Sequence, residues 1–375
     1  MTLQRPHTSV LIVPTGIGAA IGGYAGDALP VARTLAQVTD RLITHPNVMN
    51  GAQMYWPMKN TFYVEGYGLD QFASGQWGLR PVHQNSIGLV IDQAMEDELR
   101  SRHLQAADAA RATLGLDIRA HVVTDKPLGV ALKTAESGAS WGTVENPGSL
   151  LRAAERLINE AGVGAIAVIA RFPDDEGSAE LEAYRQGKGV DLLAGAEAVI
   201  SHLVVRTFKI PCAHAPALAP IPLDTSISPR SAAEELGYTF LPCVLAGLSR
   251  APQFVLETSA PVSDSASGSA SGSVFGSIVA DSTIMTADQV DAVIVPATAF
   301  GGSAVMSLAP MLNRLGRQVI AVGENSTAMA VRAADLGIKA IALNSYLEAA
   351  GTIAAYRAGV THTALRPEAC SIPLL

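Results

Sequence analysis

Histidines at three places in the chain stand where they could exchange protons with a substrate. His45 ends a short apolar run in "RLITHPN", and His214 lies in "PCAHAP". His202 follows "GAEAVIS", where Glu197 and Ser201 stand one turn apart and share a face of the expected helix. Histidine titrates near neutral pH, so each of the three could act as a general acid or base. The alternative for each is a buried histidine that makes one satisfied hydrogen bond.

Two cysteines, Cys212 and Cys243, each follow a proline, in "IPCAHAP" and "LPCVLAG". Such a pair could flank a substrate carbon and exchange its proton, as in cofactor-independent racemases. Small buried apolar side chains are the commoner role of free cysteine. The chain has no HExxH, CxxC, GxSxG, SxxK or GxxxxGK(S/T) motif, which argues against zinc hydrolases, serine hydrolases and P-loop NTPases.

The stretch "VLIVPTGIGAAIGG" places several glycines directly after a branched aliphatic run. Glycine allows positive φ and lets backbone N–H groups approach an anion at a helix N-terminus. The spacing is one residue longer than the dinucleotide fingerprint, so it does not specify a nucleotide. Tight packing of a strand against a helix is the alternative. We expect a ligand-binding loop formed by Thr15, Gly16, Gly18, Gly22 and Gly23.

A second stretch, "AVIVPATAFGGSAV", resembles the first, with an apolar strand ending in Val-Pro followed by a small-residue loop. Each copy then reaches a second strand and an asparagine-bearing turn, "LITHPNVMNG" in one and "VIAVGENSTAM" in the other. Two similar βαβ halves would place these loops at the same edge of a sheet. Chance similarity between two valine-rich strands is the alternative. Gly301 and Gly302 would then form the second ligand-binding loop.

Polar residues just past strand ends are the expected lining of a cleft between the two loops, because open parallel sheets bind ligands at that edge. His45, Asp125 and Glu324 are the predicted catalytic residues, and Asn47 and Asn325 the predicted ligand-binding ones. Strand ends also meet solvent and carry polar turn residues without any function. Clustered carboxylates could hold Mg²⁺ or act as acid and base, so the need for a metal or another cofactor stays unknown.

Short apolar runs alternate with helical patterns along the chain, as in βαβ units. The runs are continuous and not alternating, so both faces of the sheet are covered. We predict an α/β protein with largely parallel sheets, helices on both faces and two similar Rossmann-like halves. The predicted strands are Val10–Val13, Ile87–Ile91, Arg119–Val123, Ala165–Ala170, Asp291–Val295, Gln318–Val322 and Lys339–Leu343, and the predicted helices include Glu96–Leu114, Ser149–Ala161 and Gly302–Leu315.

Two segments break this pattern. Residues 50–84 carry many tryptophans and tyrosines and look too irregular for a helix, so we expect a lid or contact surface there, with its Tyr55–Trp77 part covering the cleft. Residues 260–276 are rich in serine, glycine and alanine and predict a flexible insertion without chemistry. We expect an N-terminal half over residues 1–145 and a C-terminal half over residues 146–375.

Composition limits the partners of the protein. The 375 residues are 49% hydrophobic and 5% aromatic and carry a formal net charge of -8, which argues against binding nucleic acid. No apolar segment approaches the roughly 20 residues needed to span a bilayer. The opening run imitates a signal peptide but meets Pro14 early. Three scattered cysteines suit a reducing compartment, so we expect a cytoplasmic protein that binds a small molecule, and a homo-oligomer stays open.

Several long blocks of the chain are distinctive. They are "VPTGIGAAIGGYAGDALPVAR", "LITHPNVMNGAQMYWP", "YVEGYGLDQF", "GAEAVISHL", "PCAHAPAL", "EELGYTFLPCVLAGLSRAP" and "VIAVGENSTAM". Together they resemble the bacterial, largely cyanobacterial, domain-of-unknown-function family DUF3326 over nearly the whole chain except the serine-rich insertion. The resemblance implies a cytoplasmic bacterial protein. It supplies no activity and no catalytic residues.

The residues themselves therefore have to suggest the function. We expect an enzyme that acts on a small anionic metabolite, bearing a phosphate or carboxylate, with isomerase, transferase and hydrolase reactions all open. The main alternative is a ligand-binding or sensing protein of the same fold without turnover. A racemase or isomerase that uses Cys212 and Cys243 is the further alternative. An enzyme needs an acid or base with a perturbed pKa, whereas a sensor needs only donors and shape.

Overall fold

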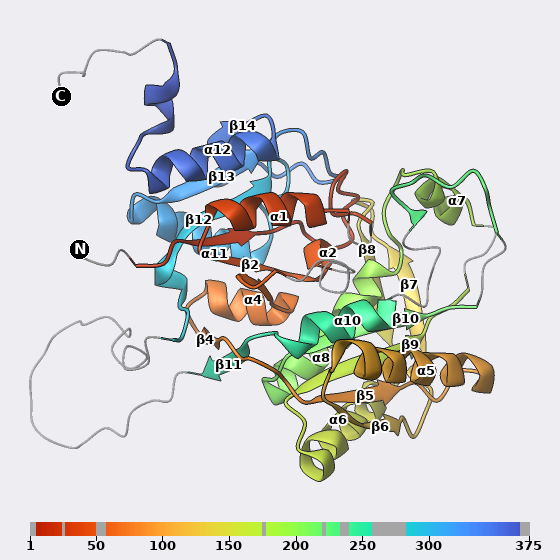
Figure 1. Cartoon of the computed structure of the whole chain (residues 1–375). Coiled ribbons are helices and arrows are strands. Elements are labelled where there is room, and N and C mark those ends of the chain that lie inside the picture. Colours follow the sequence, from red (N-terminus) through yellow and green to blue (C-terminus); the bar gives the residue numbers. More distant parts are fainter. Residues whose placement is uncertain are drawn as a thin grey trace, which may run out of the picture.

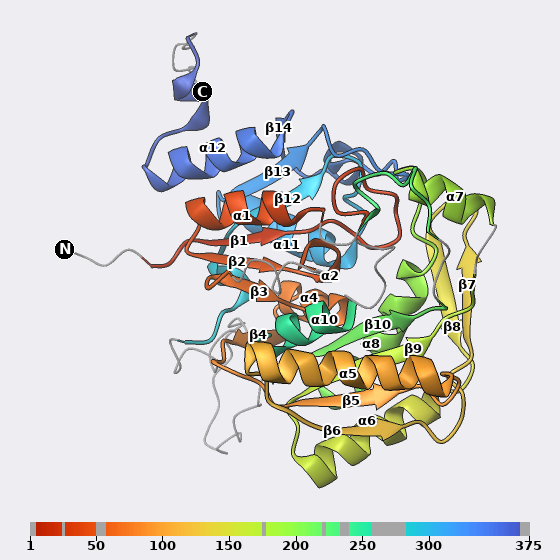
Figure 2. The same ribbon diagram turned by 45° about the vertical axis from the view of Figure 1, so that its right-hand side comes forward.

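The computed structural model describes residues 5–24, 27–49, 58–174, 178–219, 223–232, 240–256 and 283–367. Two parallel β-sheets with helices packed on their faces make up most of this part of the chain (Figures 1 and 2). The predicted insertion at 260–276 and the first part of the predicted lid, residues 50–57, lie outside the described residues.

The larger sheet has six strands in the order β14-β13-β12-β1-β2-β3, and all neighbours are parallel. The strand order reverses between β1 and β12, so the carboxyl ends of these two strands lie side by side. The strands are β1 (Thr8–Leu11), β2 (Arg41–Thr44), β3 (Thr61–Tyr63), β12 (Val290–Pro296), β13 (Gln318–Val322) and β14 (Ile341–Leu343).

Helices cover both faces of the larger sheet (Figure 2). On one face, Leu11 and Ile294 join the core under α1 (Leu29–Val38) and α12 (Tyr346–Arg357). On the other face, Val10 and Val293 join the core under α4 (Gly66–Ala73) and α11 (Ser303–Arg314). Successive strand residues thus point to opposite covered faces, which explains why these strands are apolar throughout.

The smaller sheet has four parallel strands in the order β10-β9-β5-β6. They are β5 (Ile87–Ile91), β6 (Ile118–Val123), β9 (Ala165–Arg171) and β10 (Cys212–Ala217). α5 (Asp97–Leu114) and α10 (Phe240–Ser249) pack on one face, and α6 (Pro147–Ala161) and α8 (Ala194–Phe208) pack on the other.

Shorter strands form two separate two-stranded sheets. β4 (Trp77–Arg80) pairs antiparallel with β11 (Gln253–Leu256), and β7 (Val130–Thr134) pairs antiparallel with β8 (Ser140–Val144). The remaining elements are α2 (Pro46–Met49), α7 (Ala179–Arg185), η1 (Ala287–Gln289), η2 (Ala333–Leu336) and η3 (His362–Leu365).

One hydrophobic core is shared by the two sheets and lies against one face of each. Leu35 of α1, Ile294 of β12, Leu89 of β5 and Leu245 of α10 belong to the same buried cluster. The predicted α/β class with largely parallel, two-sided sheets is confirmed, and each predicted strand and helix is present with small shifts of its ends. The larger sheet takes strands from both sides of residue 145, while the division into two Rossmann-like halves stays a prediction.

Several elements were not predicted, among them β10 and the elements in the described part of the lid segment. β10 contains Pro216, which is tolerated because β10 is the edge strand of the smaller sheet among the described residues. The described part of the predicted lid is not irregular, because it holds β3, α4 and β4; the prediction that it was too irregular for a helix is wrong. Gly68 weakens the helical pattern of α4 in the sequence. Glycine is needed at this position because a Cβ would lie 2.3 Å from Cζ of Phe254.

Candidate functional site

A buried carboxylate begins the candidate site, at the edge where the larger sheet meets the smaller one. Glu65 follows β3 and is the N-cap of α4, and its side chain accepts hydrogen bonds from the backbone N–H groups of Tyr67 at 2.9 Å and Gly68 at 3.2 Å. Glu65 is only 1% exposed. The N-terminus of α4 favours a negative charge at this position, which offsets part of the cost of burying it.

His202 of α8 forms an ion pair with Glu65 through its Nδ1 atom. The side chain of His202 is 40% exposed, whereas that of Glu65 is 1% exposed. Burial alone would lower the pKa of His202, but the close contact with the charged Glu65, together with the charge of Asp70, raises it above the ordinary value. α4 and α8 can approach this closely because residue 66 is glycine; a Cβ there would lie 2.9 Å from Cε1 of His202.

Three more side chains extend this pair into the smaller sheet. Ser201 Oγ donates to Oε1 of Glu65 at 3.4 Å and lies 3.2 Å from Nδ1 of His214 on β10. Nε2 of His214 lies 3.5 Å from Oε2 of Glu197, one turn before Ser201 on α8. Ser201, His214 and Glu197 are all buried. The five side chains form one chain of polar contacts from α4 through α8 to β10.

Other titratable groups surround this chain. Burial, with the charge of Glu65, raises the pKa of the Tyr63 hydroxyl and of the Cys212 thiol well above their ordinary values. Burial also raises the pKa of Asp70, which interacts with the backbone of Ala304 at the start of α11. The ring of Tyr67 lies beside that of His202, with centroids 6.3 Å apart. His202 thus has the tilted ring of Tyr67 beside it and is influenced by the charge of the partly buried Asp70.

These groups suit proton transfer better than metal binding. An exposed histidine that contacts a buried carboxylate is the arrangement in which a carboxylate orients an imidazole and stabilises its protonated form. In the part of the chain that the structure describes, no three His, Cys, Asp or Glu side chains are grouped so that they could hold a metal ion. The candidate site therefore consists of Glu65, Glu197, Ser201, His202 and His214.

His45, the first predicted catalytic residue, lies elsewhere and has a different environment. It is fully buried after β2, and its Nε2 accepts a hydrogen bond from the backbone N–H of Val13 at 2.9 Å. Burial lowers the pKa of His45 to about 4. This nitrogen is therefore occupied in joining the ends of β1 and β2, which favours a structural role. The side chain of Asn47 lies outside the described part of the chain.

The glycines of the first predicted loop meet other parts of the protein. A Cβ at Gly16 would lie 2.5 Å from Oγ of Ser140, and one at Gly23 would lie 2.3 Å from the carbonyl oxygen of Ala19. Gly16, Gly18 and Gly22 have positive φ angles of 70°, 60° and 89°. Each glycine has a conformational or packing reason to be glycine. Ligand binding by this loop, including Thr15, stays a prediction.

Asn325 and Glu324 also bind backbone. The Asn325 side chain accepts from the N–H of Ile21 at 2.9 Å and donates to the carbonyl of Ile21 at 2.8 Å, which fastens the first loop to the turn after β13. Glu324 accepts from the N–H of Tyr346 at 2.8 Å, at the start of α12. Because β2 and β13 are parallel strands of one sheet, the turns after them lie at the same edge, but Asn325 and Glu324 shape loops there.

Asp125 and the second glycine loop complete the predicted set. Asp125 is exposed and pairs with Arg152; hydrogen bonds from Arg152 and Ser149 lower its pKa to about 2, as in a surface ion pair. Gly301 and Gly302 are exposed before α11. Asp70 already interacts with Ser303 and Ala304 at this helix N-terminus, where an anion would otherwise bind.

Neither Cys212 nor Cys243 readily loses its thiol proton to form a thiolate. Burial raises the pKa of Cys243 to about 12, and that of Cys212 well above its ordinary value. Both thiols are buried and free. A thiolate is the form that would abstract a proton, so these environments disfavour the racemase alternative.

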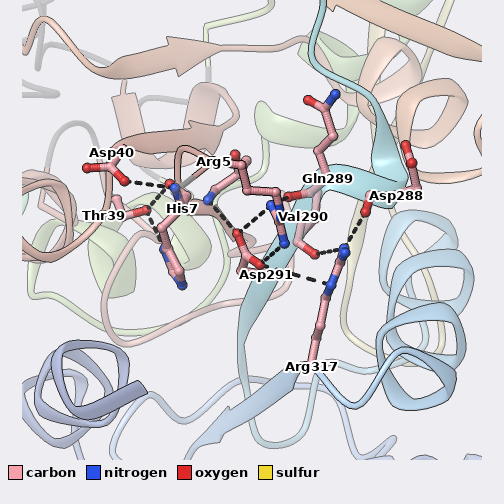
Figure 3. Close-up of polar contacts among 10 residues, drawn as sticks. Arg5, His7, Thr39, Asp40, Asp288, Gln289, Val290, Asp291 and Arg317 are labelled. Atoms are coloured by element: carbon pink, nitrogen blue, oxygen red, sulfur yellow. Dashed lines mark hydrogen bonds and ion pairs between the residues drawn. The ribbon is translucent and has the colours of Figure 1, made fainter. Parts of the chain in front are cut away.

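A second polar cluster lies at the opposite ends of the strands (Figure 3). Asp291 of β12 is 3% exposed and pairs with Arg5 and, at 4.0 Å, with Arg317. Burial lowers the pKa of the neighbouring His7, partly offset by the charge of Asp291. These ion pairs fasten the start of the chain to β12. Their place at the amino ends of the strands favours a structural role.

Sequence reasoning found the two histidines, Glu197 and Ser201 of the candidate site, but it missed Glu65. Glu65 directly follows the apolar run "TFYV", so a carboxylate at the end of a buried strand was its only local signal. Its contact with His202 joins segments far apart in the sequence, and no spacing pattern reports such a contact.

Comparisons with known proteins agree with the resemblance seen in the sequence. The chain is 59% identical over 365 residues to a protein named "Uncharacterized lipoprotein" from Synechococcus sp.. The matched residues cover 97% of this chain and 95% of that protein. The word lipoprotein belongs to the name of that relative, and a cytoplasmic location of this chain stays a prediction. Among the described residues, no helix is long and apolar enough to cross a membrane.

No solved structure matches the chain. The family model described as "Protein of unknown function (DUF3326)" matches residues 8–366. This match covers nearly the whole sequence, from β1 to the end of η3. The chain therefore belongs to the DUF3326 family of proteins of unknown function.

Proposed function

We propose that this protein is an enzyme that acts on a small molecule by general acid–base chemistry, with His202 as the acid or base and Glu65 as the carboxylate that orients it. The observation that carries the proposal is the pairing of a 40% exposed imidazole with a carboxylate that has 1% side-chain exposure. A structural ion pair does not need one partner at the surface, whereas an acid–base catalyst has to reach its substrate.

The surroundings of His202 support a small anionic substrate. A protonated His202, whose charge is balanced by Glu65, could donate its Nε2–H to a phosphate or carboxylate group. The ring of Tyr67 lies beside the imidazole, tilted by 56° with the centroids 6.3 Å apart, and adds apolar surface there. Nδ1 of His202 faces Glu65, so Nε2 is the nitrogen that would exchange a proton with the substrate. A phosphate- or carboxylate-bearing metabolite with an acidic C–H or O–H bond fits these properties.

The test is a screen for turnover with one active-site variant and one control. Purified protein is incubated with a small-molecule extract of bacterial cells in deuterated buffer, and mass spectrometry follows compounds that change in amount or gain deuterium. His202→Gln should lower the rate of any such change by about 100-fold or more, the usual contribution of a general acid or base. His121→Gln is the control, because His121 is exposed on β6.

Two outcomes would contradict the proposed enzymatic function. One is an extract that the wild-type protein leaves unchanged; the other is a His202→Gln protein as active as the His121→Gln control. A compound that the protein retains without changing it would instead support the ligand-binding or sensing alternative.

A further inference from the structure

Ser201 lies between two pairs of titratable side chains. Its Oγ is 3.4 Å from Oε1 of Glu65, which pairs with His202, and 3.2 Å from Nδ1 of His214, which pairs with Glu197. A hydroxyl has one proton to donate and can accept two hydrogen bonds. When Ser201 donates to Glu65, a proton on Nδ1 of His214 can complete the contact; when Ser201 donates to His214, that nitrogen must be unprotonated.

The position of the Ser201 proton therefore depends on the protonation of both pairs. Ser201 and Glu65 are each 1% exposed, and His214 and Glu197 are each 8% exposed, so bulk water screens these charges poorly. A positive charge on His214 would be balanced by Glu197, whose Oε2 lies 3.5 Å from Nε2. The carbonyl oxygens of Glu197 and Ala198 lie 3.4 and 3.3 Å from Ser201 Oγ and also accept its proton in the helix.

Other titratable groups that face this array do not compete for a proton near neutral pH. The Tyr63 hydroxyl on β3 and the Cys212 thiol on β10 have pKa values raised by burial, so both stay protonated. Asp70 on α4 is directed to the start of α11, where Ser303 and Ala304 interact with it. The proton-accepting atoms left within the array belong to Glu65, Glu197, His202 and His214.

We propose that Ser201 relays protons between the Glu65–His202 pair and the His214–Glu197 pair, so that His214 stores a proton taken from the substrate. The proposal rests on the acid–base role of His202. It makes Glu65, Ser201 and His214 positioning residues, since they act through His202 and do not touch the substrate.

The relay moves one proton and leaves each intermediate group as it was. Nε2 of His202 takes the substrate proton while its Nδ1–H bond breaks and that proton passes to Oε1 of Glu65. Glu65 passes a proton to Ser201 Oγ as the hydroxyl proton of Ser201 moves to Nδ1 of His214. Glu65 and Ser201 regain their starting forms, His202 is neutral again with its proton on Nε2, and His214 becomes a cation beside the carboxylate of Glu197.

Histidine side-chain NMR can measure the predicted coupling in the folded chain without a substrate. The titration midpoint of His202 is compared in the wild type, His214→Gln, Ser201→Ala and the double variant, a double-mutant cycle. We expect His214→Gln to shift the His202 midpoint by at least about 0.3 pH unit, a twofold change in proton affinity. Ser201→Ala should abolish most of that shift, and Ser201→Thr, which keeps a hydroxyl, should preserve it.

Two results would overturn the relay. His214→Gln that leaves the His202 midpoint unchanged would show that the two pairs are not coupled. An equal shift with and without the Ser201→Ala substitution would show that the coupling acts through space and not through the hydroxyl. Both results concern coupling and not turnover, so they are distinct from a failure of the metabolite screen, which would contradict the acid–base function itself.

Discussion

Two regions of the molecule gather polar side chains, and they use them in different ways. At the carboxyl ends of β1, β2 and β13, His45 binds the backbone of Val13, and Asn325 binds the backbone of Ile21. Between α4 and α8, Glu65 and His202 contact each other. A side chain that binds backbone fixes the path of a loop, whereas titratable side chains in mutual contact can exchange protons.

The first region is the one where the topology of an open parallel sheet predicts a ligand site. Its strand order does reverse between β1 and β12. The loops that follow β1 and β13, however, bind each other. Ala20 N–H donates to the carbonyl of Ser326 at 2.9 Å, and Ala328 N–H donates to the carbonyl of Ile17 at 2.8 Å. Topology thus locates an edge, and the bonding of each side chain decides what that edge can do.

The largest effect expected from this comparison is a loss of folding stability at acidic pH caused by His45. Its pKa in the folded protein is about 4, below the ordinary value of 6.5, because burial disfavours the charged ring. The folded state therefore binds fewer protons than the unfolded state, and stability is lost as the pH falls from 6.5 toward 4. The difference of about 2.5 pH units corresponds to about 3 kcal/mol.

Urea unfolding at pH 7 and pH 4 checks this effect in the wild type and in His45→Gln. Glutamine keeps an oxygen that can accept from Val13 but has no proton to gain, so this variant should lose about 3 kcal/mol less between the two pH values. His121→Gln should behave as the wild type. A His45→Gln protein with the wild-type acid sensitivity would mean that His45 is not the buried, neutral group described here.

The next effect distinguishes packing from ligand binding in the two glycine loops. Gly23→Ala would bring a Cβ within 2.3 Å of a backbone oxygen, and should cost about 1–3 kcal/mol of unfolding free energy. Gly302→Ala meets no atom within 4 Å and should cost less than about 1 kcal/mol. Thermal unfolding of both variants compares them. Equal, small costs would remove the packing role and favour a ligand-binding first loop.

The smallest effect is expected at Asp125. Its carboxylate is exposed and pairs with the exposed Arg152, and such surface pairs contribute little to stability. Asp125→Asn should leave the urea midpoint at pH 7 and any turnover found in the metabolite screen unchanged. Lost turnover with a retained midpoint would return Asp125 to the catalytic residues and contradict its surface role.

The sequence was sufficient to predict the α/β class because the longer strands and helices leave local patterns. β5 and β13 were predicted to the residue, since each is a continuous apolar run between polar turns. β10 was missed because proline and alanine dominate "CAHAPA", and α4 because two glycines weaken its helical pattern. In both cases tertiary contacts outweigh local preference: β10 pairs with β9 at the edge of the smaller sheet, and Phe254 packs closely against Gly68 of α4.

The candidate site was predictable only where its residues are neighbours along the chain. Glu197, Ser201 and His202 share one helix, so their spacing showed that they could act together. Glu65 comes from α4, and only the fold brings it to His202. Burial is equally hidden in the sequence: both His45 and His202 were candidate acid–base residues, but His45 is buried and bound to backbone while His202 is 40% exposed.

The central claim is that Glu65 makes His202 an accessible proton-exchanging group, and an NMR titration of the His202 ring tests it most directly. In the wild type the pKa of His202 should lie above 6.5, so the pair stabilises the fold fully below pH 6.5 and less as the pH rises through the folded-state pKa. Glu65→Gln, whose amide oxygen can still cap α4, should lower the pKa of His202. A His202 pKa at or below 6.5, or one that Glu65→Gln leaves unchanged, would contradict the account.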